Sequence, residues 1–475
     1  MQPFFVTYML KPMIRLIALL FLFSVNRMQA QSMEIVFGDS LQNCSAKTIV
    51  YSNNNLAILV GCIDSSSQNN NYIYQFDSGG SYINSCLLPI NSMVAERMTL
   101  SGNDFLICGS VFDSTGDAQA VLMKVGPSCN FKWEKRFGFP ASDESFRGVC
   151  TLPDGNIAGS GLTKNPSGPG NAYYAVKTDS AGNFIWEQIY STSFNSYSDA
   201  IVSLSDGTMV LSGDRAGGSV PYNNTTIRID SSSSIIWEFE SSNPYNNGCK
   251  NDMLTSDGNI LVVGESSTAT NLIFDPLISK VDTAGHEVWS YIYSGSPGST
   301  DALLDICEIN PDRFIAAGFG ANPVTSSTDI LVIVIDSAGT EKYRTSIGDT
   351  SGIDLANDII TAPNNQGVYI CGSSHRNGKT RAYLVYRSLG VLQSVEERTT
   401  SDLYVYPNPA NEMLLIHGYD NKEIIQSFIY DIHGRKIMEK SSGRSIDVSN
   451  LNNGVYMLQL VEKKGTSLIK FIVQR

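Results

Sequence analysis

The sequence predicts an all-β protein, a seven-bladed β-propeller followed by a small C-terminal Ig-like β-sandwich. A short apolar strand that ends in glycine recurs at steps of 48 to 54 residues. Asp-Gly or Asn-rich hairpin turns join it to the strand before it, and the repeat stops near residue 393, where a different alternating pattern begins. Four-stranded antiparallel units repeated at this period are typical of β-propellers.

Residues 1–30 have the pattern of a signal peptide. Lys11 and Arg15 precede the apolar run LIALLFLFSV, and Ala30 supplies a small residue at the expected cleavage point. The run is too short to span a hydrocarbon core of ~30 Å, which favours a cleaved signal over a membrane anchor. No later segment is apolar enough to cross a bilayer, so we expect no transmembrane segment after signal cleavage.

The composition indicates an acidic, turn-rich protein. Its formal net charge of −13 and pI near 4.8 disfavour nucleic acid and anionic membranes as partners. Nine cysteines occur without a CxxC pair, so a zinc site is not indicated. Exported chains can form disulfides, but an odd count leaves at least one thiol unpaired. Cys150 and Cys307 fall at a repeat position otherwise held by Val or Met, and we expect both in the core.

The propeller repeat occupies residues 31–393. Its aligned strands end at Gly61, Gly109, Gly161, Gly213, Gly264, Gly318 and Gly372. A strand-like run and a tight turn precede each of these strands, which is a strong hairpin signal because glycine tolerates positive φ. After each glycine come a polar loop, a third strand such as YYAVKTD and a fourth strand that begins at Trp or Tyr. A linear β-solenoid is the alternative, but its repeats are shorter and it needs capping units.

The start of the mature chain is predicted to close the ring. Residues 33–39 lie within MEIVFGDS, which is similar to WEKRFGF and YRTSIGDT, the openings of two fourth strands. The seventh repeat supplies only three clear strands of its own, the last near RAYLVYRS. We therefore expect residues 33–39 to be the outer strand of blade 7, which leaves no open edge between the first and last blades.

All four tryptophans stand at one position of the repeat, residues 133, 186, 237 and 289. Burial of each indole at an outer corner, against the next blade, explains this pattern better than ligand stacking, which would favour the variable loops. The turn before each Trp, such as DSAG or DTAG, supplies capping oxygens and a glycine. These corners resemble the blade repeat of quinoprotein-like propellers. Adjacent cysteines and axial metal ligands of that group are absent, so no cofactor and no metal are expected.

The candidate ligand site is the axial mouth, where loops before the innermost strands converge. Counting upstream from the hairpins places five charged residues there: Lys47, Arg147, Asp199, Lys250 and Asp358. Neighbouring blades would alternate Arg147, Asp199 and Lys250 in sign, and Asp358 would meet Lys47 across the closure. The ring would grip a polar ligand or hold an acid–base pair. Alternatively, the charges only form ion pairs between blades, each contributing ~0–1 kcal/mol.

Two functions remain open, and no catalytic residue is assigned. Only His286 and His375 lie in the propeller, and no HExxH, GxSxG or phosphate-binding motif occurs. The first hypothesis is a secreted or cell-surface binding protein for an extracellular protein or glycan. The alternative is an enzyme that degrades extracellular polysaccharide or protein, with Asp199 and Asp358 as acid and base. A glycosidase would need its carboxyls about 5 Å or about 6.5–9.5 Å apart.

Residues 401–475 follow a linker at 394–400 and carry a second pattern. Alternating apolar residues between Asn, Gly and Pro turns indicate a small β-sandwich. The segment closely resembles the type A C-terminal sorting domain of the type IX secretion system of Bacteroidota. The matching positions are Tyr406, Pro407, Asn408, Pro409, Asp431, Gly434, Arg435, Leu451, Gly454 and Tyr456.

This resemblance implies an export route and its partners. The domain would guide the chain across the outer membrane through the type IX machinery. A sortase-like peptidase would then remove it near residues 394–402, and the product would be released or attached at the cell surface. The alternative is a fused adhesion-type sandwich with no sorting role.

Overall fold

The computed structural model describes the chain from Ser32 to Gln474 with gaps. Residues outside the description are 1–31, 39–41, 91, 169, 191–194, 218–219, 244, 268–272, 296–297, 323–326, 349–351, 377, 394–403, 418–423, 432–435, 442, 463–464 and 475. The predicted signal peptide and linker therefore lie outside the described residues. The chain divides into two compact units, Met1–Leu392 and Gln393–Arg475. No helix within the described ranges is long and apolar enough to cross a membrane.

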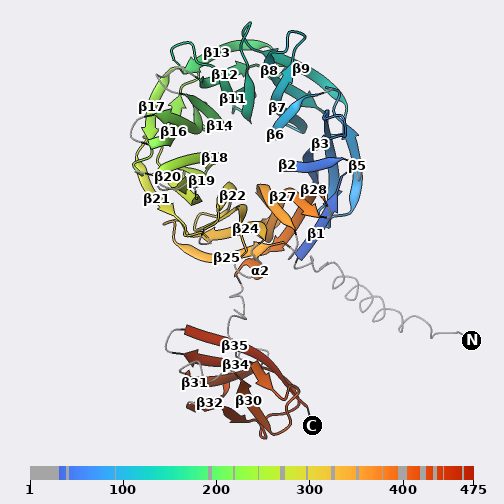
Figure 1. Ribbon diagram of the computed structural model, residues 1–475, viewed down its shortest axis with the longest axis vertical. Coiled ribbons are helices and arrows are strands. Elements are labelled where there is room, and N and C mark those ends of the chain that lie inside the picture. Colours follow the sequence, from blue (N-terminus) through green and yellow to red (C-terminus); the bar gives the residue numbers. More distant parts are fainter. Residues whose placement is uncertain are drawn as a thin grey trace, which may run out of the picture. The chain divides into compact units, whose positions relative to one another are not determined.

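The first unit is a ring of four-stranded antiparallel groups (Figure 1), two of which are joined into one eight-stranded sheet by a parallel pairing of Thr328 with Ile353. In each group the chain runs outward from the centre. The first strands face the centre of the ring and are β2 (Asn43–Ser52), β6 (Val94–Ser101), β10 (Ser145–Thr151), β14 (Ser196–Ser203), β18 (Asn246–Leu254), β22 (Ala302–Asn310) and β26 (Ile353–Thr361). The second strands are β3 (Asn55–Ile63), β7 (Asp104–Phe112), β11 (Ile157–Lys164), β15 (Met209–Gly217), β19 (Ile260–Ser267), β23 (Arg313–Ala321) and β27 (Gly367–Arg376).

The remaining strands complete each group toward the periphery. The third strands are β4 (Asn69–Asp77), β8 (Ala118–Val125), β12 (Asn171–Thr178), β16 (Val220–Ile229), β20 (Asp275–Val281), β24 (Thr328–Ile335) and β28 (Lys379–Ser388). The fourth strands are β5 (Tyr82–Leu87), β9 (Phe131–Phe137), β13 (Phe184–Tyr190), β17 (Ile235–Glu240), β21 (Glu287–Ile292) and β25 (Glu341–Ile347). The prediction of an all-β protein with repeated four-stranded sheets is confirmed.

The group of β26, β27 and β28 takes its fourth strand from the start of the described chain. Strand β1 (Ser32–Phe37) pairs antiparallel with β28, for example Met33 with Tyr386. The Tyr383 hydroxyl donates a hydrogen bond of 2.6 Å to Glu34, and Arg387 forms an ion pair with the same carboxylate. Met33 and Ile35 pack on the apolar core beneath them. The two ends of the ring are therefore joined by both backbone and side-chain contacts.

Each first strand carries a β-bulge at one equivalent position. Regular pairing with the second strand is interrupted by one extra residue, which is Lys47, Glu96, Arg147, Asp199, Lys250, Leu304 or Asn357. A bulge leaves its extra residue unpaired and redirects the side chain. We call these positions the axial rim.

The bulge explains the repeated glycine of the second strand. Gly264 pairs with Cys249, directly before the bulge, and a Cβ on Gly264 would lie 1.9 Å from the carbonyl oxygen of Gly248. The same obstruction, at 1.8–2.0 Å, faces Gly109, Gly161, Gly213, Gly318 and Gly372. Gly61 pairs one residue further from its bulge, and its Cβ would meet nothing closer than Asn71 Oδ1 at 3.5 Å. The glycine is thus required by close backbone approach in every group except the first.

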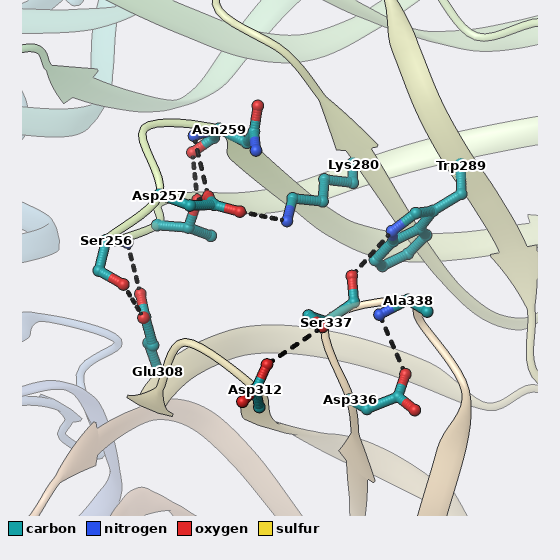
Figure 2. Close-up of polar contacts among 11 residues, drawn as sticks. Ser256, Asp257, Asn259, Lys280, Trp289, Glu308, Asp312, Asp336, Ser337 and Ala338 are labelled. Carbon is teal, nitrogen blue, oxygen red and sulfur yellow. Dashed lines mark hydrogen bonds and ion pairs between the residues drawn. The ribbon is translucent and has the colours of Figure 1, made fainter.

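The outer corners join each group to the next, as predicted for the tryptophans. The Trp289 indole donates a hydrogen bond of 3.2 Å to the carbonyl of Ser337 in the turn between β24 and β25 (Figure 2). In the same turn, Asp336 Oδ1 accepts a hydrogen bond of 3.0 Å from the Ala338 amide. Trp186 and Trp237 make equivalent bonds of 3.0 and 2.9 Å to the next turns. All four indoles are half-buried, so none of them stands in open solvent.

The cysteines divide between two disulfides and the core. Cys44 is bonded to Cys62 across β2 and β3, and Cys86 is bonded to Cys129. The other five thiols are free and buried, at Cys108, Cys150, Cys249, Cys307 and Cys371. Burial raises the pKa of Cys108 and Cys150 to about 12, which keeps these thiols unreactive. Core positions for Cys150 and Cys307 are confirmed.

The second unit contains two small sheets that share one core. One sheet has the order β29 (Tyr404–Tyr406), β30 (Met413–His417) and β33 (Ser445–Asp447). The other has the order β32 (Lys436–Ser441), β31 (Ile424–Asp431), β34 (Gly454–Glu462) and β35 (Gly465–Val473). Leu414 from the first sheet and Leu458 and Phe471 from the second belong to the same buried cluster.

Candidate functional site at the ring axis

The axial rim places charged side chains around one hollow. Five residues line this rim hollow of about 280 Å³: Glu96, Arg97, Arg147, Asp199 and Lys250. Four of them are bulged rim residues from neighbouring first strands, and their charges alternate in sign. Because a bulge turns its extra residue out of the ladder, these long side chains reach the axis instead of packing between sheets.

Arg147 and Asp199 form the central ion pair of the rim hollow. Arg147 Nη1 lies 2.6 Å from Asp199 Oδ1, and the guanidinium covers the Tyr197 ring at 4.7 Å. Burial raises the pKa of Asp199, and the charge of Arg147 offsets part of that rise. The Arg147 side chain is 38% exposed, whereas that of Asp199 is 14% exposed. The arginine therefore remains accessible to a ligand while it neutralises the buried acid.

Lys250 has a different partner from the predicted one. Its ammonium lies 2.8 Å from Glu265 of the adjacent strand β19, and no ion pair with Asp199 is found among the described residues. Burial lowers and the Glu265 charge raises the pKa of Lys250, with a net rise. Lys47 approaches Glu96 at 4.0 Å. Of the three residues predicted to pair in sequence, Arg147 and Asp199 form an ion pair between neighbouring groups. Lys250 pairs instead with Glu265 of its own group.

Asp358 does not lie on the rim. The bulged residue of β26 is Asn357, and Asp358 follows it. Asp358 Oδ2 accepts a hydrogen bond of 2.8 Å from the Ile49 amide, so it contacts the backbone of β2. No ion pair between Asp358 and Lys47 is found in the described part of the chain. Strands β26 and β2 are therefore in contact where the ring closes, as expected, but the contact joins the Asp358 carboxylate to a backbone amide of β2 and not to Lys47.

A second hollow, of about 380 Å³, is lined by residues that follow the bulges. Asp358 lines it together with three residues that the sequence analysis missed: Arg97, Asp252 and Asp305. Asp305 accepts a hydrogen bond of 2.9 Å from the Ile359 amide and another from the side chain of Asn251. Arg97 is the one side chain that lines both hollows, which places the second hollow next to the first.

Alignment on the wrong feature caused these omissions. Counting back from the glycine selected Ala95 and Asp358, each one residue from the rim position. Except in β18, each rim residue lies two positions before an apolar residue, so an alignment on these apolar residues would have found the rim. They are Ile49, Met98, Val149, Ile201, Ile306 and Ile359. Asp252 occupies the same position in β18. An acid where the other first strands have an apolar residue could have identified Asp252 as a candidate site residue.

The arrangement does not assemble an acid–base pair from the predicted residues. Asp199 lines the rim hollow and Asp358 lines the second hollow. Each is already engaged, Asp199 by Arg147 and Asp358 by the Ile49 amide. Within the described residues, no group of three or more His, Cys, Asp and Glu could hold a metal ion. The contacts that the rim side chains make are ion pairs and hydrogen bonds.

Several sorting-motif positions make contacts within the second unit. Asn408 Oδ1 accepts a hydrogen bond of 2.9 Å from the Ile472 amide, which ties the opening motif to the final strand. The peptide bonds that precede Pro407 and Pro409 are cis. Leu451 is buried, and the Tyr456 ring stacks on Phe471 with ring centroids 5.7 Å apart. Gly434 and Arg435 lie outside the described residues.

Residues 404–474 match the family model of the secretion system C-terminal sorting domain. This is a type IX sorting signal, so the protein is secreted to the cell surface or beyond. No curated protein matches the chain.

Solved structures resemble the chain only distantly. PorZ, a surface component of the type IX system of Porphyromonas gingivalis, is 12% identical, with 89% of this chain and 69% of PorZ covered and a TM-score of 0.35. YCF48 bound to D1 peptide is 13% identical, with coverages of 75% and 95% and a TM-score of 0.44. Trypanosoma rangeli sialidase is 9% identical, with coverages of 92% and 88% and a TM-score of 0.43. Similarity this distant says nothing about activity or ligand.

Proposed function

We propose that the protein is a non-enzymatic binding protein of the cell surface or the medium. Its binding site is the axial rim of a seven-bladed propeller, and its ligand is an extracellular glycan or protein. An N-terminal signal peptide at 1–30 begins export from a Bacteroidota cell. The Ig-like C-terminal domain is then removed near residues 394–402 by the sortase-like peptidase of the type IX system.

The observation that carries this proposal is the charged rim around the 280 Å³ hollow. The side chains of Lys47, Glu96, Arg147 and Lys250 are 34–38% exposed, so they keep contact with solvent while their stems are fixed. Alternating donors and acceptors suit sugar hydroxyls and the polar side chains of a protein. Ion pairing alone would not need these groups around an open hollow.

The binding proposal is tested with arrays of glycans and extracellular matrix proteins. The purified full chain should bind one ligand class, and the double variant Arg147→Gln/Lys250→Gln should lose that signal. The matched control is Lys132→Gln/Lys342→Gln, which removes two positive charges from exposed sites on β9 and β25. Equal binding by both double variants would reject the rim as the site. No binding by the wild-type chain to any array would reject the proposal.

The enzymatic alternative makes a separate prediction. If Asp199 were a catalytic acid or base, the chain would hydrolyse some polysaccharide or protein substrate, and Asp199→Asn would abolish that activity. We expect no turnover in a screen of extracellular polymers, because Asp199 is neutralised by Arg147 and Asp358 lies in another hollow. Turnover that is lost in Asp199→Asn would overturn the binding proposal.

The processing step is tested by truncation. Deletion of residues 401–475 should leave the protein inside the cell, because the sorting signal is lost. Mass spectrometry of the exported wild-type product should find a new C-terminus between residues 394 and 402. An exported product that retains residues 404–474 would contradict removal of the domain.

A further inference from the structure

Asp252 is the exceptional member of a ring of apolar side chains. Two residues after each bulge, the other first strands present Ile49, Met98, Val149, Ile201, Ile306 and Ile359 to the second hollow. Asp252 occupies this position in β18 and lines the same hollow of about 380 Å³. One carboxylate thus stands among six apolar neighbours that surround a shared space.

The carboxylate of Asp252 is buried without an ion pair among the described residues. The residue is 6% exposed, and neither oxygen has a well-formed hydrogen bond, although the Ser212 hydroxyl lies near enough to lower the pKa of Asp252 in part. Its charged neighbours at the hollow are Arg97 from β6, Asp305 from β22 and Asp358 from β26. The buried Arg97 Nε also lacks a hydrogen bond. Buried polar groups are nearly always satisfied in folded proteins, so a buried carboxylate that lines a cavity with capacity for further donors is a candidate ligand-binding group.

The charge around the second hollow favours a cation. Three acids and one guanidinium line it. Burial and the neighbouring Asp305 raise the pKa of Asp358, so the charge that faces Arg97 comes from Asp305 and, above its own pKa, from Asp252. Asp305 and Asp358 already accept hydrogen bonds from backbone amides, so Asp252 is the acid with the most capacity left to receive a donor. A hard metal ion would need several oxygens at short distance, and no such group occurs in the described ranges. The apolar ring instead suits a cation that carries a hydrocarbon chain.

We infer that the second hollow binds a primary alkylammonium group, with its ammonium on Asp252 and its alkyl chain against the surrounding Ile and Val side chains. A lysine side chain of a protein ligand or a free aliphatic amine would present this chemistry. The inference goes beyond the proposed function, since it concerns a second hollow and a different acid. Its failure would leave binding at the rim untouched.

The test measures binding of n-butylammonium chloride to the purified full chain by isothermal titration calorimetry at pH 8. n-Butanol and sodium butyrate serve as the neutral and anionic probes. The wild-type chain should bind the ammonium more tightly than either probe. Asp252→Asn, which keeps the shape and removes the charge, should bind it at least about tenfold more weakly. The matched control Glu134→Gln removes an acid from the outer strand β9 and should bind as the wild type does.

A pH profile provides a second measure that does not depend on a variant. Burial raises the pKa of Asp252 to about 7, so the ionised fraction falls about tenfold between pH 8 and pH 6. The affinity for n-butylammonium should fall with it. Equal affinity for n-butanol, tighter binding of butyrate at Arg97, undiminished binding by Asp252→Asn or a flat pH profile would each overturn the inference. Absence of any amine binding at pH 8 would do so as well.

Discussion

The outer corners and the axial rim both recur around the ring, but they repeat in different ways. At the corners the residue type recurs: Trp186, Trp237 and Trp289 all donate a hydrogen bond to the same carbonyl position of the following turn. At the rim the backbone recurs as a bulge, while the side chain changes between cation, anion, amide and Leu. The same residue type at equivalent corners indicates a structural role. Different side chains at equivalent rim positions indicate that the rim residues have separate roles.

The largest expected effect tests whether the bulge dictates the glycine. Gly264→Ala should destabilise the ring unit by about 3 kcal/mol, because its Cβ would lie 1.9 Å from the Gly248 carbonyl oxygen. Urea unfolding followed by circular dichroism measures the change. Gly61→Ala is the control within the same repeat and should change stability by less than about 0.5 kcal/mol. A similar loss of stability in both variants would show that the bulge is not the reason for the glycine.

A substitution at the ring axis should raise stability, whereas Gly264→Ala lowers it. Asp252→Asn should stabilise the chain at pH 8 by on the order of 2 kcal/mol, since it removes a buried carboxylate that has no ion pair among the described residues. Because burial raises the pKa of Asp252 to about 7, above about 3.9 in the unfolded chain, the wild-type chain loses stability as pH rises across this window.

Thermal melts between pH 4 and pH 8 measure this difference. The gain from Asp252→Asn should be absent near pH 4, grow up to about pH 7 and then stay constant. A gain that is the same at all pH values would mean that the carboxylate is not the cause.

A corner substitution should destabilise moderately. Trp237→Ala removes a half-buried indole that lies against Gly285 and a hydrogen bond of 2.9 Å to the Thr283 carbonyl. We expect a loss of about 2 kcal/mol, and Trp237→Phe should restore part of it by keeping an aromatic ring. Ligand binding at the rim should be unchanged in both variants. If binding is lost while the fold is retained, the assignment of the corners as purely structural is wrong.

The smallest expected effect concerns the rim ion pair. Arg147→Gln should lower stability by at most about 1 kcal/mol, because the Arg147 side chain is 38% exposed and its pair is screened by solvent. Its stability cost should be far below that of Gly264→Ala. A loss as large as that of the glycine variant would show that the rim charges serve mainly to hold the ring together.

Much of the ring could be predicted because its repeats are strongly periodic. Tight turns, the recurring glycine and the position of Trp133 and its equivalents all report local backbone geometry, and repetition along the chain reinforces each signal. The extent of indole burial could not be predicted, because a Trp on the outermost strand of a sheet is only half-buried. Partner choice for the cysteines could not be predicted, since disulfides depend on three-dimensional proximity.

The axial site was only partly predictable for a specific physical reason. The hairpin that connects the first and second strands varies in length. Gly109 pairs with Ala95, 14 residues back, whereas Gly372 pairs with Ala356, 16 residues back. A fixed count therefore selected Ala95 instead of Glu96 and Asp358 instead of Asn357. Which cation meets which anion also depends on neighbouring strands. Lys250 binds Glu265 of the adjacent strand, a contact that spacing within the first strands does not reveal.

The most direct test of the account is the affinity of the rim variant Arg147→Gln/Lys250→Gln for the ligand identified on the arrays, measured beside the corner variant Trp186→Phe/Trp237→Phe. The account predicts that the rim variant loses at least about tenfold in affinity and melts close to the wild type. The corner variant should melt earlier and bind with unchanged affinity. Unchanged affinity in the rim variant would contradict the claim that the axial rim is the binding site.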